Sequence, residues 1–294
     1  MTTWTIIYNP TSGHFRQDRL EAVCDILRGA GIEPLPQPTQ YAGHAVELAR
    51  AAKGVDRVVA HGGDGTLNEV ATGMLGEGKS PNPIPLAFLP GGTANAMAFE
   101  LGIPCNPVRA VERLLRAEPK PVRPGLVDGR PFMLMASFGF DALAVYMVKG
   151  AVKAKLGASA YLAMGVRALW HPKPQITVTL PDGTQHTGVW VVGSRARRYG
   201  GRLYIHPKAS LQADDLGVTT IRKAAIAPFA FTHLLFGVGW NGGGIDLSQA
   251  REFSVEAQQP VHVQVDGEYL HQGTKFQVSQ AEQPIQFCIP QPRA

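Results

Sequence analysis

Residues 58–75 read VVAHGGDGTLNEVATGML, and this stretch decides how the first part of the chain folds. Its first three residues form an apolar run typical of a β-strand, and later apolar residues recur at helical spacing, at Leu67, Val70, Ala71 and Met74. Between the two patterns, Gly62, Gly63 and Gly65 lack the Cβ that would keep an anion away from backbone N–H groups at a helix N-terminus. The stretch therefore predicts a strand, a phosphate-binding turn and a helix, in that order.

Asp64 stands inside this glycine-rich turn. Bound phosphates beside it require a cation or a proton acceptor rather than more negative charge. We therefore expect Asp64 to serve a Mg²⁺ ion or a nucleophile. His61, which precedes the glycines, is interpreted as a packed or hydrogen-bonded side chain.

Two other loops have the same character. The apolar run 4–8 (WTIIY) leads into 9–13 (NPTSG), and the run 85–89 (PLAFL) leads into 90–95 (PGGTAN). In an open parallel sheet, the loops that follow the carboxyl ends of strands meet along one edge, where ligands bind. One glycine loop alone would suit a tight turn equally well, but the three loops together predict a nucleotide site.

The chain is predicted to contain two domains. Residues 1–124 alternate β-type runs with helical patterns, which indicates a doubly wound α/β domain. Beyond the proline-rich stretch 119–124, helical patterns at 142–155 and 158–170 give way to short β-type runs, so residues 125–274 are expected to form a predominantly antiparallel β-sandwich. These runs are 176–180, 188–192, 218–221, 252–256, 261–265 and 276–279.

Most of the net charge of +5 comes from the second part of the chain, where residues 126–274 carry 14 Lys and Arg against 10 Asp and Glu. The basic residues that gather there are Arg195, Arg197, Arg198 and Arg202, with Lys149, Lys153 and Lys155 on or beside a predicted helix. They form either a solvated basic face or a surface that attracts an anionic membrane. Nucleic acid is not expected as a partner, because no aromatic platform or nucleic-acid motif accompanies the arginines.

The expected compartment is the cytoplasm. The three cysteines are far apart and have no metal-site spacing, and the N-terminus lacks the pattern of a signal peptide. Residues 224–245 carry no charge, but Pro228, His233 and several glycines interrupt them, so a buried or interfacial segment is expected rather than a spanning helix. Any membrane contact is expected to be peripheral.

The motifs at 9–13, 62–70 and 90–95 resemble the diacylglycerol kinase catalytic-domain family, which includes bacterial soluble lipid kinases, sphingosine kinases and ceramide kinases. Further motifs follow in the family's order: Phe138-Gly139-Phe140-Asp141, Tyr199-Gly200-Gly201, Pro207-Lys208-Ala209, and Val265-Asp266-Gly267-Glu268. The chain departs from the common bacterial pattern at Asn95-Ala96, where many members have Asn-Asp, at Asp214-Asp215, where Asp-Gly is usual, and at Arg202, which follows only two glycines.

This resemblance implies ATP- and Mg²⁺-dependent phosphorylation of a lipid hydroxyl, such as that of diacylglycerol, a sphingoid base or ceramide. It implies ATP on the first domain, lipid at a membrane surface on the second, and a last segment, 275–294, that returns to the first domain. The residues that it assigns to ATP are Asn9, Pro10, Thr11, Ser12, Gly13, Thr39, Gly62, Gly63, Asp64, Gly65, Thr66, Leu67, Asn68 and Thr93. A helix cap is the alternative role for Thr39, and a homodimer is compatible with the sequence.

For catalysis, the resemblance makes Glu268 the leading proton acceptor, with Asp266 positioning it or binding metal-linked water. Asp64 is the rival acceptor, and an ordinary hairpin turn is the alternative for Asp266-Gly267. The resemblance also places a structural Mg²⁺ on the backbone carbonyls of Leu211 and Leu216 and the carboxylate of Asp214, where oxygen ligands suit that ion. The alternative there is an Asp-Asp turn without metal.

Two other functions compete with a lipid kinase. The first is a kinase of a soluble substrate related to NAD kinase, which shares the Gly-Gly-Asp-Gly core. The second is a nucleotide- or lipid-binding protein without turnover. The apolar helical patterns at 142–170 argue against the first, and the presence of both Asp64 and Glu268 argues against the second.

Overall fold

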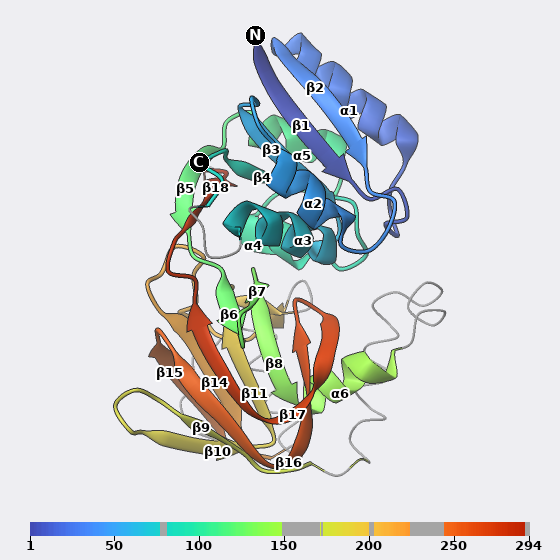
Figure 1. Cartoon of the computed structure of the whole chain (residues 1–294). Coiled ribbons are helices and arrows are strands. Elements are labelled where there is room, and N and C mark those ends of the chain that lie inside the picture. Colours follow the sequence, from blue (N-terminus) through green and yellow to red (C-terminus); the bar gives the residue numbers. More distant parts are fainter. Residues whose placement is uncertain (77–80, 149–170, 172, 200–202, 224–243, 292–294) are drawn as a thin grey trace. The chain divides into compact units, whose positions relative to one another are not determined.

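The computed structural model describes residues 1–76, 81–148, 171, 173–199, 203–223 and 244–291, and the chain divides into two compact units (Figure 1). The first unit comprises Met1–Arg123 and Glu282–Ala294, and the second comprises Pro124–Ala281. Residues 275–281 were expected in the returning tail, but they lie in the second unit because strand β17 (Glu268–Gln280) continues through them. The helical pattern at 149–170 and the segment 224–243 lie outside the described residues.

Within the described residues, the first unit contains a six-stranded sheet in the order β2-β1-β3-β4-β18-β5. Its strands are β1 (Thr2–Tyr8), β2 (Ile32–Pro38), β3 (Arg57–Gly62), β4 (Leu86–Pro90), β5 (Glu118–Val122) and β18 (Ile285–Ile289). Neighbours are parallel from β2 to β18, and β5 alone is antiparallel, to β18. The predicted doubly wound α/β architecture is confirmed, with β18 from the C-terminal segment inserted next to β4.

Five helices accompany this sheet in the described part of the first unit: α1 (Gln17–Gly29), α2 (His44–Ala51), α3 (Asp64–Leu75), α4 (Ala96–Leu101) and α5 (Pro107–Leu114). The core between helices and sheet consists of fully buried apolar side chains such as Ile6, Val59 and Phe88. Helices α2 and α3 lie side by side (Figure 1), and a Cβ on Gly73 of α3 would stand 2.4 Å from the Val46 carbonyl oxygen of α2. The glycine at position 73 therefore sets how closely these two helices pack.

Strand β5 (Glu118–Val122) was not expected, because its sequence EPKPV reads as a proline-rich linker. It lies at the edge of the sheet, where it pairs only with β18. An edge strand bonds a neighbour on one side only, so Pro119 and Pro121 are tolerated there although they have no N–H to donate. The supposed linker is thus an edge strand of the first unit's sheet.

The second unit contains, among its described residues, a ten-stranded antiparallel sheet along the path β15-β14-β11-β8-β16-β17-β6-β7, with β9 and β10 joined at β16. Its strands are β6 (Gly125–Val127), β7 (Arg130–Phe132), β8 (Met135–Gly139), β9 (Ile176–Thr179), β10 (Gln185–Gly188), β11 (Trp190–Ser194), β14 (Leu216–Ile221), β15 (Ile245–Ala250), β16 (Phe253–Val265) and β17. A short pair, β12 (Arg198–Tyr199) and β13 (Leu203–Tyr204), stands apart, and helix α6 (Phe140–Met147) follows β8.

Strand β16 folds this sheet into the predicted β-sandwich, because its two ends pair with different strands. Its residues 254–257 pair with β9, whereas residues 263–265 pair with β8. The register against β17 shifts between Glu256 and Val261, so the two strands expected at 252–256 and 261–265 are one irregular strand that contains Pro260. The enclosed core is rich in valine, with the rings of Phe138 and Phe276 5.2 Å apart.

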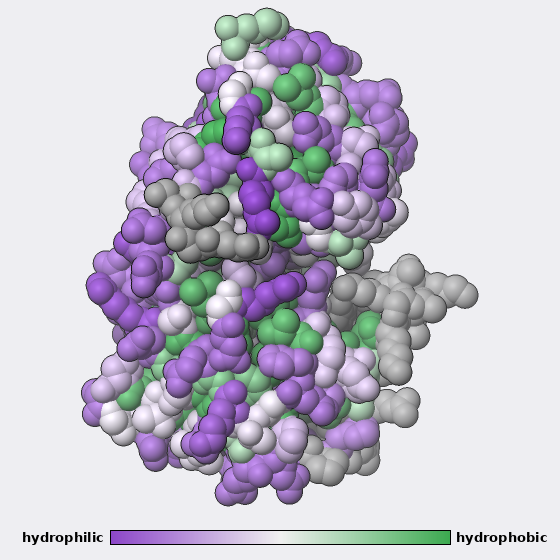
Figure 2. Space-filling model, viewed as in Figure 1, coloured by the Kyte–Doolittle hydropathy of each residue, from purple (hydrophilic) through white to green (hydrophobic). Residues whose placement is uncertain are grey.

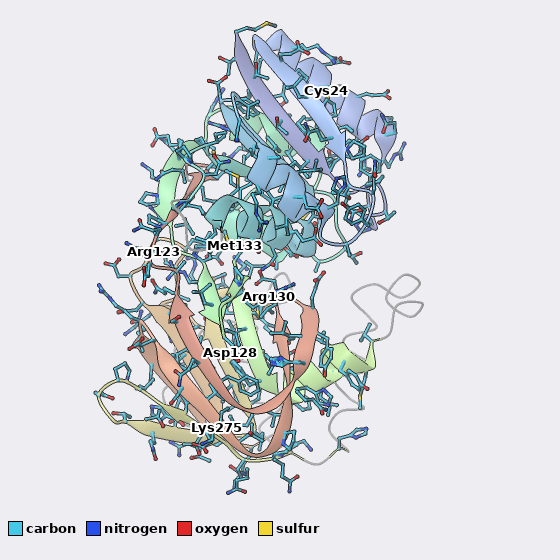
Figure 3. The ribbon with its side chains drawn as sticks, in the orientation of Figure 1. Cys24, Arg123, Asp128, Arg130, Met133 and Lys275 are labelled. Carbon is cyan, nitrogen blue, oxygen red and sulfur yellow. The ribbon has the colours of Figure 1, made fainter. Side chains whose placement is uncertain are left out.

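Aspartate side chains bind backbone groups of neighbouring strands in this unit. Asp128, labelled in Figure 3, lies in the turn between β6 and β7, and its Oδ1 accepts a hydrogen bond from the Gln277 amide of β17 at 2.8 Å. The Asp128 amide in turn donates to the Gln277 carbonyl. A turn residue therefore extends the strand pairing beyond the end of β6.

The three cysteines are free thiols. Cys24 (Figure 3) and Cys288 are buried, and Cys105 is exposed. Burial raises the pKa of Cys288 to about 11, so its thiol stays protonated at neutral pH.

Candidate functional site

Three loops meet at one edge of the first unit's sheet. The register pairs Tyr8 with His61 and His61 with Leu89, so β1, β3 and β4 end at the same level. Backbone hydrogen bonds then join the loops, from the Asn9 amide to the His61 carbonyl at 3.1 Å and from the Gly91 amide to the Gly62 carbonyl at 2.7 Å. The predicted loop residues 9–13, 62–66 and 90–95 are therefore neighbours in space.

The contact between the second and third loops depends on glycine. A Cβ on Gly92 would lie 2.4 Å from the Cα of Gly63, a separation that real Cβ contacts do not show. A Cβ on Gly13 would lie 2.6 Å from the Thr93 Oγ1. This edge is thus built from closely approaching backbone, whose N–H groups are the donors that phosphate oxygens require.

Asp64 joins the second loop to the third. Its Oδ2 accepts a hydrogen bond from the Ala96 amide at 2.9 Å, and its Oδ1 accepts from the Met97 amide at 3.0 Å. These two amides open helix α4, where no residue of the helix itself supplies an acceptor. Burial raises the pKa of the Asp64 carboxyl, and the two amide hydrogen bonds act against that rise. The hydrogen bonds of Asp64 therefore connect the start of α3 to the start of α4.

Asn95, the residue before α4, holds the third loop through its side chain. It has a left-handed backbone, with φ of 49°, and its side chain both accepts from the Gly92 amide at 2.9 Å and donates to the Gly92 carbonyl at 2.7 Å. His14 was not expected at the site, yet its Nδ1 lies 2.7 Å from the same carbonyl and donates to it. His14 directly follows the predicted loop 9–13, so its place next to that loop in the sequence could have indicated it.

The remaining residues assigned to ATP occupy three kinds of position. In the first loop, the amide and hydroxyl of Thr11 both donate to Asn9 Oδ1, so Asn9 shapes the turn. Thr39 lies at the end of β2, its amide donating to the Tyr8 carbonyl, and it is not the cap of α2, because that helix begins after Gly43. Leu67 is fully buried in α3, which leaves only its backbone near the turn.

His61 is a packed side chain, as expected. It is 1% exposed, and its Nδ1 lies 3.2 Å from the Leu89 carbonyl. Burial lowers the pKa of this imidazole, so the ring is neutral at pH 7. A neutral ring in the core gives His61 a role in packing rather than in proton transfer.

In the second unit, Asp266 and Gly267 form the tight turn between β16 and β17. Both have positive φ, 49° and 84°, and Val265 pairs with Glu268 across the turn, which is the geometry of a type I′ hairpin. The Asp266 carboxylate accepts hydrogen bonds from the amides of Met133, Leu134 and Met135, at 2.7, 2.8 and 2.9 Å. Both oxygens therefore hold the connection between β7 and β8, and the role of Asp266 in positioning Glu268 or binding metal-linked water stays a prediction.

Glu268 is in a different situation two residues later. It is the first residue of β17, and its side chain is exposed. Within the part of the chain that the structure describes, no hydrogen bond or ion pair engages its carboxylate. Of the three acids assigned to catalysis, Glu268 is the one whose carboxylate forms no hydrogen bond or ion pair with the described residues.

Asp141 is a buried acid to which the sequence assigned no role. It lies in the first turn of α6, where the Tyr199 hydroxyl donates to Oδ1 and the Gln264 amide group donates to Oδ2 at 3.0 Å. Burial raises the pKa of the Asp141 carboxyl, against the effect of these donors. Gln264 also accepts from the Gly267 amide at 2.8 Å. Hydrogen bonds therefore run from Asp141 to the turn that precedes Glu268.

The turn assigned to a structural Mg²⁺ contains a different cation. The buried guanidinium of Arg195 donates to the Leu211 carbonyl at 2.6 Å and to the Asp215 carbonyl at 3.2 Å. The Asp214 side chain is exposed, while Leu216 begins β14 in the core. In the described part of the chain, no group of three or more His, Cys, Asp or Glu side chains is arranged to hold a metal. Because the cationic guanidinium of Arg195 is bound to the Leu211 carbonyl, which the implied site gives to Mg²⁺, the residues present do not fit that site.

This finding also corrects the predicted basic surface. Arg195 is 1% exposed, so it cannot be part of a solvated or membrane-facing patch. Arg197 is exposed, and the Arg198 guanidinium lies 4.5 Å from the Tyr204 ring centroid. Arg202, Lys149, Lys153 and Lys155 lie outside the described residues.

The described surface has no spanning segment. None of the helices whose residues are described is long and apolar enough to cross a bilayer. On the face drawn in Figure 2, hydrophilic residues are spread among apolar ones in both units. Among the described residues, the large apolar side chains that are exposed are Met1, Leu35, Tyr41, Tyr146 and Tyr269.

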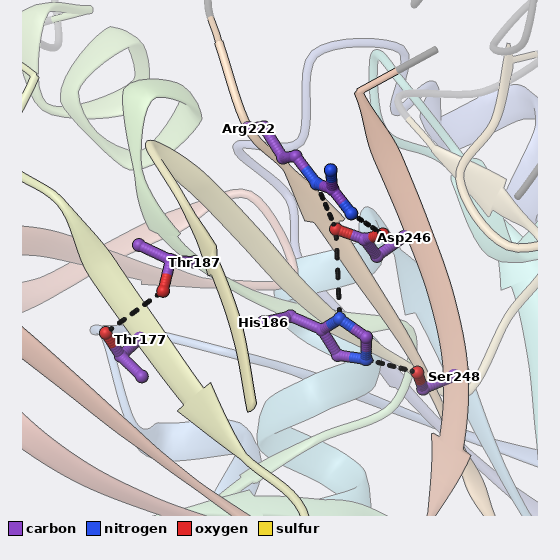
Figure 4. A network of polar contacts seen from close by, with 6 residues as sticks. All are labelled: Thr177, His186, Thr187, Arg222, Asp246 and Ser248. Carbon is purple, nitrogen blue, oxygen red and sulfur yellow. Dashed lines mark hydrogen bonds and ion pairs between the residues drawn. The ribbon is translucent and has the colours of Figure 1, made fainter. Parts of the chain in front are cut away.

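One surface cluster has the residue types of a hydrolase triad without its geometry (Figure 4). His186 Nε2 lies 3.1 Å from Ser248 Oγ, but His186 Nδ1 is 3.8 Å from Asp246, which is too long for a hydrogen bond. Arg222 binds both oxygens of Asp246, at 2.6 and 2.8 Å. The Asp246 carboxylate thus binds the arginine, and the cluster connects β10 to β15, the strand that pairs with β14.

Comparison with known proteins reveals relatives for both units. The family description "Diacylglycerol kinase catalytic domain" matches residues 3–127, and "YegS C-terminal NAD kinase beta sandwich-like domain" matches residues 135–281. The diacylglycerol kinase of Bacillus subtilis is 30% identical, over 90% of this chain and 89% of that protein. A Pseudomonas aeruginosa protein named "Probable lipid kinase YegS-like" is 31% identical, over 93% of this chain and 90% of that protein.

A solved structure agrees with the fold. The crystal structure of a diacylglycerol kinase from Bacillus anthracis covers 99% of this chain and 97% of its own, with a TM-score of 0.76 at 21% identity. The two-unit architecture and the relatives define the class of this protein as a kinase. The chain belongs to the diacylglycerol kinase catalytic-domain family, as its motifs indicate.

The close approach of two loops gives a first prediction. Replacing Gly92 with Ala should push the third loop away from Gly63 and lower ATP affinity about tenfold or more, equivalent to about 1.4 kcal/mol. Isothermal titration measures the affinity. Gly29→Ala is the matched control, since no atom lies within 4 Å of its added Cβ, and it should bind as the parent does. Parent-like affinity in Gly92→Ala would contradict the loop assignment.

The link between α3 and α4 gives a second prediction. Asp64→Ala leaves two helix amides without their acceptor, so the free energy of unfolding should fall by about 1–3 kcal/mol. Asp64→Asn keeps one side-chain carbonyl and should lose less. Urea denaturation tests both, with exposed Asp25→Ala as a control that should stay within about 0.5 kcal/mol. If Asp64→Ala and Asp25→Ala unfold at the same urea concentration, the hydrogen bonds of Asp64 to α4 do not contribute to stability.

Proposed function

We propose that this protein transfers the γ-phosphate of ATP to a lipid hydroxyl, with Mg²⁺. The observation that carries the proposal is the division of the acidic motif residues: Asp64 and Asp266 are bound to backbone amides, and Glu268 is left with an exposed, uncommitted carboxylate. A proton acceptor for the attacking hydroxyl must be within its reach and not already occupied. Glu268 meets the second condition.

The first unit would bind the nucleotide. Its three loops present backbone of glycine-rich sequence at one sheet edge, which suits the triphosphate of ATP. Mg²⁺ bound with the nucleotide would neutralise the negative charge that shifts between phosphate oxygens during transfer. Asp64 is the acidic side chain at this edge, and each of its oxygens retains a second lone pair besides the one that accepts an amide.

The second unit would supply the proton acceptor. The lipid hydroxyl oxygen forms a bond to the γ-phosphorus, the bond between that phosphorus and the bridging oxygen breaks, and ADP leaves. The hydroxyl proton passes to the Glu268 carboxylate. The tight turn at Asp266-Gly267 holds the start of β17, and with it Glu268, in one place. A fixed backbone at this position limits where the Glu268 carboxylate can lie, which favours correct orientation in catalysis.

The acceptor class is inferred from relatives. Proteins of similar length and sequence are named as diacylglycerol kinase or as a lipid kinase, which supports a lipid rather than a soluble acceptor. The likeness of the second unit to a "NAD kinase beta sandwich-like domain" concerns its fold. A cytoplasmic enzyme that contacts anionic membranes peripherally fits this acceptor.

The test of this function is product analysis. Purified protein is incubated with ATP, Mg²⁺ and total extracted lipid, and the lipids are analysed by mass spectrometry. We expect one or more lipid classes to gain the mass of a phosphate group, in step with ADP formation. ADP release without any phosphorylated lipid, or phosphate appearing on a soluble cofactor instead, would reject the proposal.

The exposed carboxylate gives a third prediction. Glu268→Gln keeps the side-chain shape but cannot accept the proton, so kcat should fall about 10²–10⁴-fold. The ATP dissociation constant should stay near that of the parent, because the missing contribution arises in the transition state. Glu252→Gln, an exposed glutamate of the same unit, is the matched control and should turn over normally. Normal turnover in Glu268→Gln would remove Glu268 from the chemistry.

A further inference from the structure

Arg195 is a charged residue placed where proteins seldom place one. It is among the largest fully buried side chains described, and it follows directly after strand β11. Its own amide and that of Ala196 both donate to the Leu134 carbonyl, at 2.8 and 3.2 Å, which fixes its backbone. A buried guanidinium requires acceptors for its N–H groups, because an unsolvated charge without them is strongly unfavourable.

One turn supplies two acceptors for this guanidinium. The guanidinium donates to the carbonyl oxygens of Leu211 and Asp215, and the carbonyl of Asp214 accepts from the Gln280 side chain at 2.7 Å. Three carbonyls of the turn 211–215 are therefore held by side-chain donors from other strands or loops of the same unit. The turn directly precedes β14, so these contacts fix where that strand begins.

We infer that the Arg195 guanidinium takes the place of the structural Mg²⁺ in this turn and makes the second unit stable without metal. The guanidinium supplies the positive charge and the fixed geometry that an ion would otherwise give to the carbonyls. A divalent ion on the Leu211 oxygen would be repelled by the cation already bound there. The side chain of Asp214 is exposed.

The inference concerns stability and is independent of the proposed phosphoryl transfer. Mg²⁺ bound with ATP belongs to the first unit, so a chelator should abolish transfer and yet leave the fold unchanged. A ligand that binds only the folded state raises the melting temperature with its concentration, so a structural Mg²⁺ would be visible as such a rise.

The experiment is thermal unfolding of the full chain, without nucleotide, in EDTA and in millimolar MgCl₂. We expect the parent to melt at the same temperature, within about 1 °C, in both, and to contain less than about 0.1 Mg²⁺ per chain by elemental analysis after gel filtration. Asp214→Asn should also melt alike in both buffers. Stabilisation of the parent by MgCl₂, or stoichiometric metal in the purified protein, would overturn the inference.

Substitutions test the guanidinium itself. Arg195→Met keeps the length of the side chain without its charge and should lower the melting temperature by several degrees, whereas Arg197→Met, its exposed neighbour, should not. Arg195→Lys retains the charge with fewer donors, so its melting temperature should lie between those of the parent and Arg195→Met. This variant also provides the test if Arg195→Met does not fold. If Arg195→Lys and Arg195→Met both have the melting temperature of the parent, the guanidinium does not hold this turn.

A second, independent observation concerns Gln264, which is 2% exposed and bonded at both ends of its amide group. One end donates to Asp141, and the other accepts from the Gly267 amide immediately before Glu268. Asp141 is itself held by Tyr199. The geometry points to Gln264 as a positioning residue that fixes the Asp266-Gly267 turn, and thereby the Glu268 carboxylate, for proton transfer.

This second inference rests on the proposed function, and a double-mutant cycle separates the two. Gln264→Leu should lower kcat about tenfold with little change in the KM for ATP, whereas exposed Gln258→Leu on the same strand should change neither. In the Glu268→Gln background, Gln264→Leu should have no further effect on kcat, because both changes remove the same step. Additive losses would overturn the role of Gln264, and a normal kcat in Glu268→Gln alone would overturn the proposed function.

Discussion

Aspartate carboxylates that accept backbone N–H groups hold this protein's loops in place. Asp64 binds the first amides of α4, and Asp266 binds three consecutive amides between β7 and β8. A hydrogen bond to a charged acceptor contributes about 1.5–3 kcal/mol, and a buried amide left without a partner is unfavourable by a similar amount. Each aspartate therefore fixes a segment far from it in sequence, across 32 or 133 residues.

This constraint decides which acids remain for chemistry. The sequence motifs make Glu268 the leading proton acceptor and Asp64 its rival, and they do not separate the two. In the structure, Asp64 and Asp266 have both oxygens bound to amides, and moving either would release a loop. Glu268 differs because the neighbouring turn holds its backbone while its carboxylate is exposed. The two aspartates hold loops in place, and the Glu268 carboxylate stays unbound and can accept a proton.

Much of the first unit could be predicted from the sequence because its signals are local. Glycine loops after apolar runs indicate strand ends, and the register of β1, β3 and β4 brings those loops together. Strand β5 was missed because its prolines suit a linker as well as an edge strand, and only pairing with the distant β18 distinguishes the two. The helical pattern of α6 was placed correctly where it is described, at 140–147.

Side-chain environments were harder to predict, since they depend on partners distant in sequence. Arg195 belongs to an arginine-rich run that favours an exposed surface, yet it lies in the core because the turn 211–215 offers carbonyl acceptors. Asp141 lies in a family motif, but its role depends on Tyr199 and Gln264, 58 and 123 residues away. No local pattern carries such information.

Hydrogen exchange at the bound amides tests the central claim most directly. The account predicts slow exchange at Ala96 and Met97 and at Met133, Leu134 and Met135 in the parent protein. Asp64→Ala should accelerate exchange at the first two amides only, and Asp266→Ala at the last three only. Fast exchange at these amides in the parent, or protection that survives removal of the aspartates, would contradict the claim that these carboxylates are committed to the backbone.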